Sequence, residues 1–204
     1  VYAKNPRDYR AGIELSIFYA RRGEAAKAVK IAEALVQIDP GNVGRLQRAW
    51  SLRLRPEGGA ALLGGTVPIV IDGIMYLPLG NAVVALEADT GRELWRHPVT
   101  GGLARRAVSW WPGDRRHRPR LFYSTGGALH ALDPRTGQKD RSFGQDGSVA
   151  IEGTPYAYPP SVFGNVLVIG ASTGELPRGP AGNTRAYGAV TGVKLWEFNS
   201  VPQP

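Results

Sequence analysis

The sequence has 204 residues, of which 43% are hydrophobic and 21% charged, an ordinary composition for a folded globular protein. It contains no cysteine, which excludes disulfides, thiolate catalysis and cysteine metal sites, and no apolar run approaches the roughly 18 residues of a membrane span. The net charge of +8 suits an acidic partner, but the densest basic run, residues 115–120, contains a proline and is typical of a solvated loop. We therefore predict no nucleic-acid binding.

Residues 1–41 predict a helical hairpin. Apolar residues recur at helical spacing on both sides of Gly23-Glu24, and Asp39-Pro40 ends the second helix. The residues Leu15, Tyr19, Gly23-Glu24, Ala28, Ile38-Asp39-Pro40 and Asn42 resemble one tetratricopeptide unit. A plain helical hairpin is the alternative. A single unit of this kind does not bury its own apolar face, so these helices are a candidate docking surface for a protein partner.

From residue 42 onward the sequence consists of short apolar runs separated by turns, and one sequence motif, called a phrase below, occurs three times. The copies are Ala85–Trp95, Ala131–Arg141 and Ala186–Trp196, each with a Thr-Gly pair at its centre. A repeat of roughly 50 residues is typical of propellers and other repeat folds. Each phrase predicts two strands joined by a tight turn, with the final Trp packed on the neighbouring repeat. The second copy has Arg141 in place of Trp, and we expect Phe143 to substitute for it.

The repeats predict three propeller blades within residues 42–204. Residues 42–54 are expected to be extended, and an Asp72-Gly73 turn between two apolar runs predicts a hairpin. Four antiparallel strands in about 30 residues make one blade, which we expect at residues 68–97, 107–132 and 161–198. A closed ring takes about four blades or more, so the sequence predicts an arc of an all-β propeller preceded by the helical hairpin.

Seven segments carry a resemblance to a known family. They are Asn42–Trp50, Pro68–Tyr76, Val84–Trp95, Arg106–Gly113, Phe143-Gly144, Val168–Glu175 and Leu195–Phe198. In order and spacing they resemble the N-terminal part of the pyrroloquinoline-quinone (PQQ)-dependent dehydrogenases, over residues 38–204. The resemblance implies an eight-bladed propeller with PQQ and Ca²⁺ on its axis, which oxidises an alcohol or a sugar by hydride transfer to the quinone. It also implies a periplasmic or membrane-associated location facing the periplasm, and a quinone or cytochrome as electron acceptor.

The resemblance assigns two segments to the cofactor site. Arg106 falls on the arginine that contacts the quinone, and its planar fork suits paired anionic oxygens. Ser172, Thr173 and Gly174 fall on the loop beside the cofactor, and Glu175 falls on a carboxylate ligand of the metal. An exposed strand-end arginine and a solvated loop glutamate are the alternatives.

Several positions depart from the family pattern. Gly65 stands where a Glu is usual and Ala157 where a Thr or Ser is usual, and both favour a competing interpretation, a propeller scaffold without cofactor that binds proteins. The adjacent cysteine pair of the alcohol-oxidising branch is absent, as in the glucose-dehydrogenase type. The family's stacking Trp, metal-binding Asn and catalytic Asp are expected beyond Pro204, so we expect the 204 residues alone to be inactive.

Two other patterns suggest different chemistry. Residues 170–174 match the G-x-S-x-G of serine hydrolases, but Pro177, Gly179 and Pro180 are incompatible with the helix that must follow. The three histidines, His97, His117 and His130, lack paired metal-ligand spacing and are expected to be surface or strand residues.

Overall fold

The computed structural model describes residues 18–19, 21–24, 26–27, 40–41, 43–52, 65–104, 106–151, 158–170 and 182–200. The chain divides into two compact units, Val1–Arg48 and Ala49–Pro204. Most of the hairpin predicted over residues 1–41 lies outside the described residues. Within the described part of the chain, no helix is both long and apolar enough to span a membrane.

The stretch expected to be extended after residue 42 is not a strand where the structure describes it. Val43–Arg45 form a short 3-10 helix, η1, and residues 46–52 have no regular structure. The expectation is wrong for residues 46–52 because no strand among the described residues pairs with them. A period of two indicates a strand only where a sheet can accept it.

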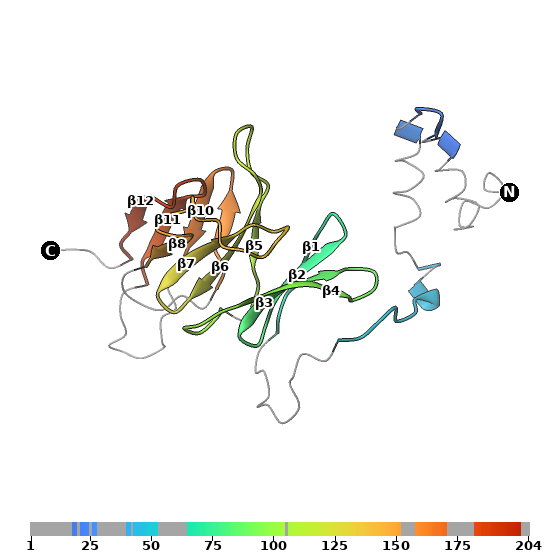
Figure 1. Ribbon diagram of the computed structural model, residues 1–204, viewed down its shortest axis with the longest axis horizontal. Helices are drawn as coiled ribbons and strands as arrows, with labels where there is room; N and C mark the ends of the chain where they lie inside the picture. The colour runs from blue at the N-terminus through green and yellow to red at the C-terminus, as the bar shows by residue number, and fades with distance from the viewer. Residues whose placement is uncertain are drawn as a thin grey trace, which may run out of the picture. The chain divides into compact units, whose positions relative to one another are not determined.

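The described part of the second unit forms three four-stranded antiparallel sheets, in which every strand pairs with its neighbour in sequence (Figure 1). The first sheet contains β1 (Ile69–Ile71), β2 (Ile74–Leu79), β3 (Ala82–Glu87) and β4 (Glu93–Pro98). The second contains β5 (Ser109–Trp111), β6 (Arg120–Thr125), β7 (Ala128–Leu132) and β8 (Ser148–Ala150). The third contains β9 (Ser161–Phe163), β10 (Val166–Ile169), β11 (Thr184–Gly188) and β12 (Lys194–Phe198).

The hairpin predicted at Asp72-Gly73 is confirmed. Both residues have positive φ, 50° and 76°, as a two-residue turn of the primed type requires. This turn sets the register in which Ile71 pairs with Ile74 and Ile69 with Tyr76.

The second sheet differs from the prediction at its last strand. The run after Gly137 was expected to be a strand, but it makes one isolated bridge between Leu132 and Lys139. The chain then turns away, and the Gly144 amide donates to the Thr191 carbonyl of the third sheet at 3.0 Å. The fourth strand of the second sheet, β8, follows this contact with the third sheet in sequence.

The core lies between successive sheets, so the middle sheet is covered on both faces. Alternate residues of β6 point to opposite faces: Leu121 and Tyr123 belong to the cluster shared with the first sheet, and Phe122 to the cluster shared with the third. A strand buried on both sides reads as a continuous apolar run, as this one does in sequence. Sheets packed face to face in this way are the arrangement expected of successive propeller blades.

The predicted docking of tryptophan on the neighbouring repeat is confirmed for Trp95. Its Nε1–H donates to the Pro134 carbonyl at 2.9 Å, and its ring lies so close to Gly137 that a Cβ there would stand 2.4 Å from Cε3. Trp50 makes the same pair of contacts with the Ala88 carbonyl, at 3.0 Å, and with Gly91. In each case the accepting carbonyl lies three residues before the glycine.

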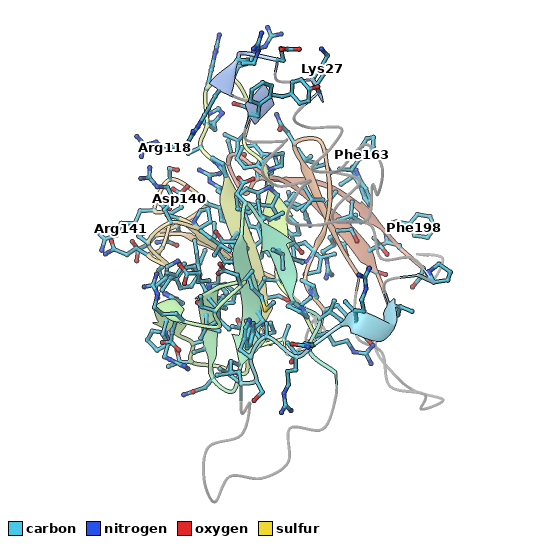
Figure 2. All side chains as sticks on the ribbon, turned by 90° about the vertical axis from the view of Figure 1, so that its right-hand side faces the viewer. Lys27, Arg118, Asp140, Arg141, Phe163 and Phe198 are labelled. Carbon is cyan, nitrogen blue, oxygen red and sulfur yellow. The ribbon has the colours of Figure 1, made fainter. Side chains whose placement is uncertain are left out.

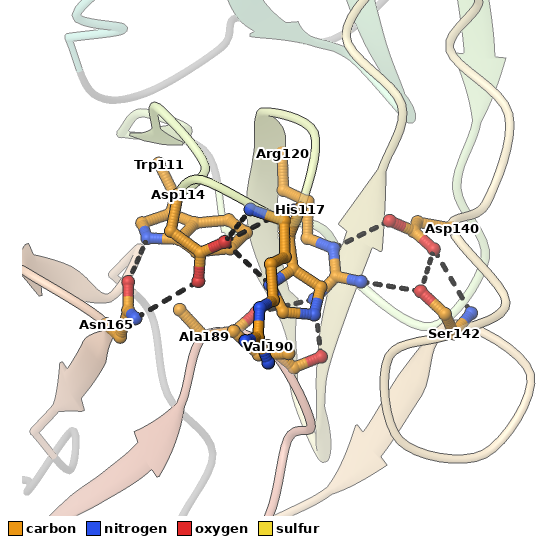
Figure 3. Close-up of polar contacts among 10 residues, drawn as sticks. Trp111, Asp114, His117, Arg120, Asp140, Ser142, Asn165, Ala189 and Val190 are labelled. Atoms are coloured by element: carbon orange, nitrogen blue, oxygen red, sulfur yellow. Dashed lines mark hydrogen bonds and ion pairs between the residues drawn. The ribbon is translucent and has the colours of Figure 1, made fainter.

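At the turn of the third copy, Arg120 makes the carbonyl contacts that a tryptophan makes at the other two turns (Figure 3). Arg120 is 3% exposed, and its Nη1 donates to the carbonyls of Ala189, at 2.7 Å, and Val190. Its Nε and Nη2 donate to Asp140 and Ser142, each at 2.6 Å. The expectation that residues 115–120 form a solvated loop is therefore wrong for Arg120.

Phe143 is fully buried in the same interface, as expected for a substitute of the missing tryptophan. The contact with Gly192 itself is made by Val149, whose Cγ2 would lie 2.5 Å from an added Cβ. Arg120, Phe143 and Val149 together thus make the contacts that a single Trp makes at the other two interfaces.

Candidate functional site

The connections between strands lie at two opposite ends of the three sheets. Because the strands are antiparallel, the connections that enter each sheet and those that join its second and third strands lie at one end. We call this end the Arg106 face; its described residues are 65–68, 80–81, 99–104, 106–108, 126–127, 151, 158–160, 170 and 182–183. The opposite end, the turn face, comprises residues 72–73, 88–92, 112–119, 133–138, 164–165 and 189–193. Of the positions that the resemblance assigns to the cofactor, Arg106 is among the described residues and lies on this face.

Arg106 is exposed and is held from two sides. Its carbonyl accepts the Val67 amide at 2.6 Å, which ties the entry to β1 to the connection before β5. Its guanidinium carbon lies 4.8 Å from the centre of the Tyr158 ring. Within the described residues its fork makes no ion pair, so the donors remain available for an anionic ligand.

Tyr158 is itself anchored to the middle sheet. The hydroxyl of Ser124, which is fully buried, donates to the Tyr158 carbonyl at 2.6 Å, and the Ser124 carbonyl accepts the Ala104 amide at 2.9 Å. Sequence reasoning missed both Tyr158 and Ser124. Tyr158 lies in a proline-rich connection without periodicity, and Ser124 sits in an otherwise apolar strand, so only the fold reveals their contact with the site.

A partly buried polar cluster lies between the first and second sheets. His97 Nε2 is 3.2 Å from the Tyr123 hydroxyl, and the Tyr123 ring stacks on His130 with 4.6 Å between centroids. The two His130 nitrogens reach Thr125 Oγ1, at 3.0 Å, and Ser148 Oγ, at 2.8 Å. Burial lowers the pKa of His130 to about 4, with further contributions from Lys139 and His97, and burial raises the pKa of Tyr123 to about 12. Both histidines are therefore neutral at pH 7.

The histidines are strand and loop residues, as expected. His97 lies on β4, His130 on β7 and His117 in the loop before β6. In the part of the chain that the structure describes, no three His, Asp or Glu side chains converge in a way that could hold a metal ion.

The second predicted segment, Ser172, Thr173, Gly174 and Glu175, lies outside the described residues, as does Ala157. The flanks of this segment, Gly170 after β10 and Gly182 before β11, are described and belong to the Arg106 face. Gly65 is exposed, and an added Cβ would meet nothing within 4 Å; the same holds for Gly170. An exposed guanidinium such as that of Arg106 fits a flat, anionic cofactor such as PQQ.

The comparison with protein families identifies the chain. A model of the PQQ family, described as "Glucose/ethanol/alcohol dehydrogenase, beta-propeller domain", matches residues 27–204. The chain belongs to this family of PQQ-dependent dehydrogenases. The resemblance found in the sequence is thereby confirmed.

Relatives in this family carry alcohol dehydrogenase names. The quinohemoprotein alcohol dehydrogenase of Comamonas testosteroni is 33% identical over 184 residues, which are 82% of this chain and 24% of that protein. The dehydrogenase subunit of alcohol dehydrogenase (quinone) of Gluconacetobacter polyoxogenes is 31% identical, over 83% of this chain and 24% of the subunit. Methanol dehydrogenase [cytochrome c] subunit 1 of Methylorubrum extorquens is also 31% identical, over 79% and 27%. The chain thus spans about a quarter of the length of these relatives.

Solved structures show the same fold. The quinohemoprotein alcohol dehydrogenase of Comamonas testosteroni superposes with a TM-score of 0.63 at 28% identity, over 82% of this chain and 25% of that one. A europium-containing methanol dehydrogenase gives a TM-score of 0.62 at 23% identity, over 80% and 29%, which supports the fold alone.

Proposed function

We propose that the protein is a PQQ-dependent dehydrogenase that oxidises an alcohol by hydride transfer to the quinone. The observation that carries this proposal is family membership over residues 27–204; an exposed Arg106 guanidinium that makes no ion pair within the described residues supports it. Arg106, Ser172, Thr173 and Gly174 would hold PQQ, and Glu175 would be a ligand of Ca²⁺. The bound quinone would supply the hydride acceptor, and the metal would supply Lewis-acid polarisation.

The described residues support the positioning of Arg106. Stacking on Tyr158 restricts the plane of the guanidinium, and the Val67–Arg106 hydrogen bond fixes the backbone beneath it. A fork held in this way loses less side-chain entropy when it pairs with two anionic oxygens. At Gly65, where the family usually has a glutamate, an added Cβ would meet nothing within 4 Å.

The names of the relatives favour an alcohol as substrate. The three relatives described above are named alcohol or methanol dehydrogenases, whereas the absence of the cysteine pair favours a glucose-type sugar substrate. We propose an alcohol first and a sugar as the second candidate. Two of those names include a quinone or cytochrome c, so we propose one of these as the electron acceptor, and a periplasmic or membrane-associated location facing the periplasm. An eight-bladed ring belongs to the same proposal.

The first test is the substitution Arg106→Lys in the full-length protein. A lysine keeps the charge but loses the paired donors and the planar stack on Tyr158, so we expect PQQ affinity to fall by at least tenfold. Titration of the apoprotein with PQQ, followed by absorbance, measures this. Arg116→Lys, an exposed arginine on the turn face, is the matched control and is expected to retain the original affinity.

The second test is Glu175→Gln, also in the full-length protein. The substitution removes a negative ligand of a hard cation, so Ca²⁺ affinity and alcohol-dependent dye reduction are expected to fall together. Assays with a primary alcohol and with glucose in parallel identify the substrate class. If Glu175→Gln keeps the original Ca²⁺ dependence and turnover, and Arg106→Lys keeps PQQ binding, the scaffold without cofactor is the better interpretation.

A further inference from the structure

A groove opens on the turn face between the first and second sheets. Its volume is about 400 Å³, within the range of small-ligand pockets. Its walls come from the β1–β2 hairpin, the long loop between β5 and β6 that rises above the sheets in Figure 1, and the turn after β7. The lining residues are Ile71, Asp72, Ile74, Tyr76, Trp110, Arg118, Pro119, Asp133, Pro134 and Arg135.

Tyr76 is the reason to regard this groove as a binding site. The side chain is 2% exposed, yet its hydroxyl makes no hydrogen bond within the described residues. Every fully buried polar side-chain atom described has a partner, so the Tyr76 hydroxyl must keep some exposure, and the groove is the opening that it lines. A buried tyrosine normally has a partner for its hydroxyl, so this one has a hydrogen bond to offer to a ligand.

The walls of the groove are held rigidly. Tyr76 packs between Trp95 and Trp110, with ring centroids 5.9 and 6.1 Å away. The Pro134 carbonyl accepts the Trp95 Nε1–H, and the Asp133 carboxylate accepts the Arg135 amide at 2.7 Å. A ligand would therefore meet a preformed surface and would not need to order it.

The rim defines the class of ligand. It carries two carboxylates, Asp72 and Asp133, and two guanidinium groups, Arg118 and Arg135, so its formal charge is zero. Within the described residues neither guanidinium makes an ion pair or hydrogen bond, and Figure 2 shows Arg118 out on its loop. Carboxylates only accept hydrogen bonds and guanidinium groups only donate them, whereas hydroxyls do both. A neutral ring bearing several hydroxyls satisfies all four groups.

We propose that this groove binds a pyranoside, with the apolar face of the sugar ring against Trp110 and the proline walls and its hydroxyls on Tyr76 and the charged rim. The site lies on the opposite end of the sheets from Arg106 and contains none of the proposed cofactor residues. It is therefore a second, non-catalytic site whose existence does not depend on the proposed function.

The test is isothermal titration calorimetry of methyl β-D-glucopyranoside into the purified 204-residue chain. We expect saturable binding with a Kd of about 1 mM. Tyr76→Phe is expected to weaken it about fivefold, the loss of one neutral hydrogen bond, and Arg118→Gln about tenfold, the loss of a charged one. Arg116→Gln, on the same loop but outside the groove, is the matched control and is expected to bind like the original chain.

Three results would overturn the proposal. The first is the absence of saturable heat with the original chain, and the second is an unchanged Kd in both Tyr76→Phe and Arg118→Gln. The third is saturable binding of benzyltrimethylammonium in place of the glucoside, which would identify a cation site. Because the Tyr76 hydroxyl has no hydrogen-bond partner to lose among the described residues, Tyr76→Phe is expected to melt at or above the original temperature, and the exposed Arg118→Gln tests the site independently of folding.

Discussion

At the scale of single residues, Arg120 does at one repeat what a tryptophan does at two others. It joins the second sheet to the third through the Ala189 and Val190 carbonyls and is neutralised by Asp140. Burial raises the pKa of Asp140, but the hydrogen bonds that its carboxylate accepts from Ser142 and Arg120 lower it more, so the pKa lies below its usual value. A fully satisfied network of this kind fixes one geometry, but it depends on every member.

Removal of Arg120 is therefore expected to be costly. Arg120→Met leaves Asp140 without its counter-ion and removes the donor to the buried Ala189 and part-buried Val190 carbonyls, so we expect the free energy of unfolding to fall by about 3 kcal/mol. Urea unfolding followed by fluorescence measures it. Arg116→Met, an exposed residue of the preceding loop, is the control and should change stability by less than about 0.5 kcal/mol. Equal effects of the two substitutions would contradict the assignment.

The partly buried His130 is expected to make the free energy of unfolding depend on pH. Its pKa in the folded protein is about 4, lowered first by burial, whereas an unfolded histidine has a pKa near 6.5. Between these values the unfolded chain binds more protons, so the contribution of His130 to the free energy of unfolding is constant above about pH 6.5 and falls as the pH drops toward 4. Allowing for partial exposure, we expect a loss on the order of 2 kcal/mol.

Thermal unfolding of the original chain and of His130→Asn across pH 4–7 measures this contribution. Asparagine retains one donor and one acceptor but does not titrate. Its profile should be flatter than that of the original chain, although His97, whose pKa is also lowered by burial, still contributes. Parallel profiles for the two proteins would show that His130 is not the titrating group.

At the scale of elements, the contact between Trp95 and Gly137 fastens the first sheet to the second. Gly137 has φ of 69°, and an added Cβ would overlap the Trp95 ring, so Gly137→Ala meets both backbone strain and a clash. We expect a loss of about 3 kcal/mol in the free energy of unfolding. Gly80→Ala separates the two effects, because φ there is 63° but nothing lies within 4 Å of the new Cβ; we expect about 1 kcal/mol.

Gly127→Ala completes the series, because its backbone is outside the left-handed region and its surroundings are open. It is expected to be neutral or slightly stabilising. Denaturant titrations of the three variants give the order Gly137, Gly80, Gly127 from most to least destabilised. A Gly137→Ala protein no less stable than Gly80→Ala would mean that the tryptophan contact carries little of the energy between the sheets.

At the scale of the whole molecule, β12 leaves an apolar strand at the edge of the third sheet. Trp196, the counterpart of Trp95, is 46% exposed, Phe198 is 66% exposed, and Leu195 beside them is also exposed; Figure 2 shows Phe198 extending from this sheet. An exposed apolar edge promotes association. We expect the 204-residue chain to associate with rising concentration, and Leu195→Lys with Phe198→Glu to reduce this. Sedimentation velocity tests it, and a monodisperse monomer at high concentration would refute it.

Much of the fold could be predicted from the sequence because its signals are local. The Asp72-Gly73 turn needs positive φ at both positions, and the runs of β3, β7, β9, β10 and β12 begin and end where turn residues force them to. The prediction was wrong where the signal depends on a partner: residues 46–52 alternate without pairing, and the second phrase ends in a bridge before β8 forms.

The features of the candidate site likewise divide into those that the sequence indicates and those that depend on the fold. The sequence by itself determined the family and the strand motifs and proposed Arg106 as a site residue, because each depends on residue types at fixed spacing along one chain. Only the tertiary structure decided that Arg120 is buried, that Tyr158 stacks on Arg106, and that Tyr76 lines a groove without a hydrogen-bond partner among the described residues. These depend on contacts between residues tens of positions apart. Burial and pairing are properties of the packed sheets, so no local pattern could have specified them.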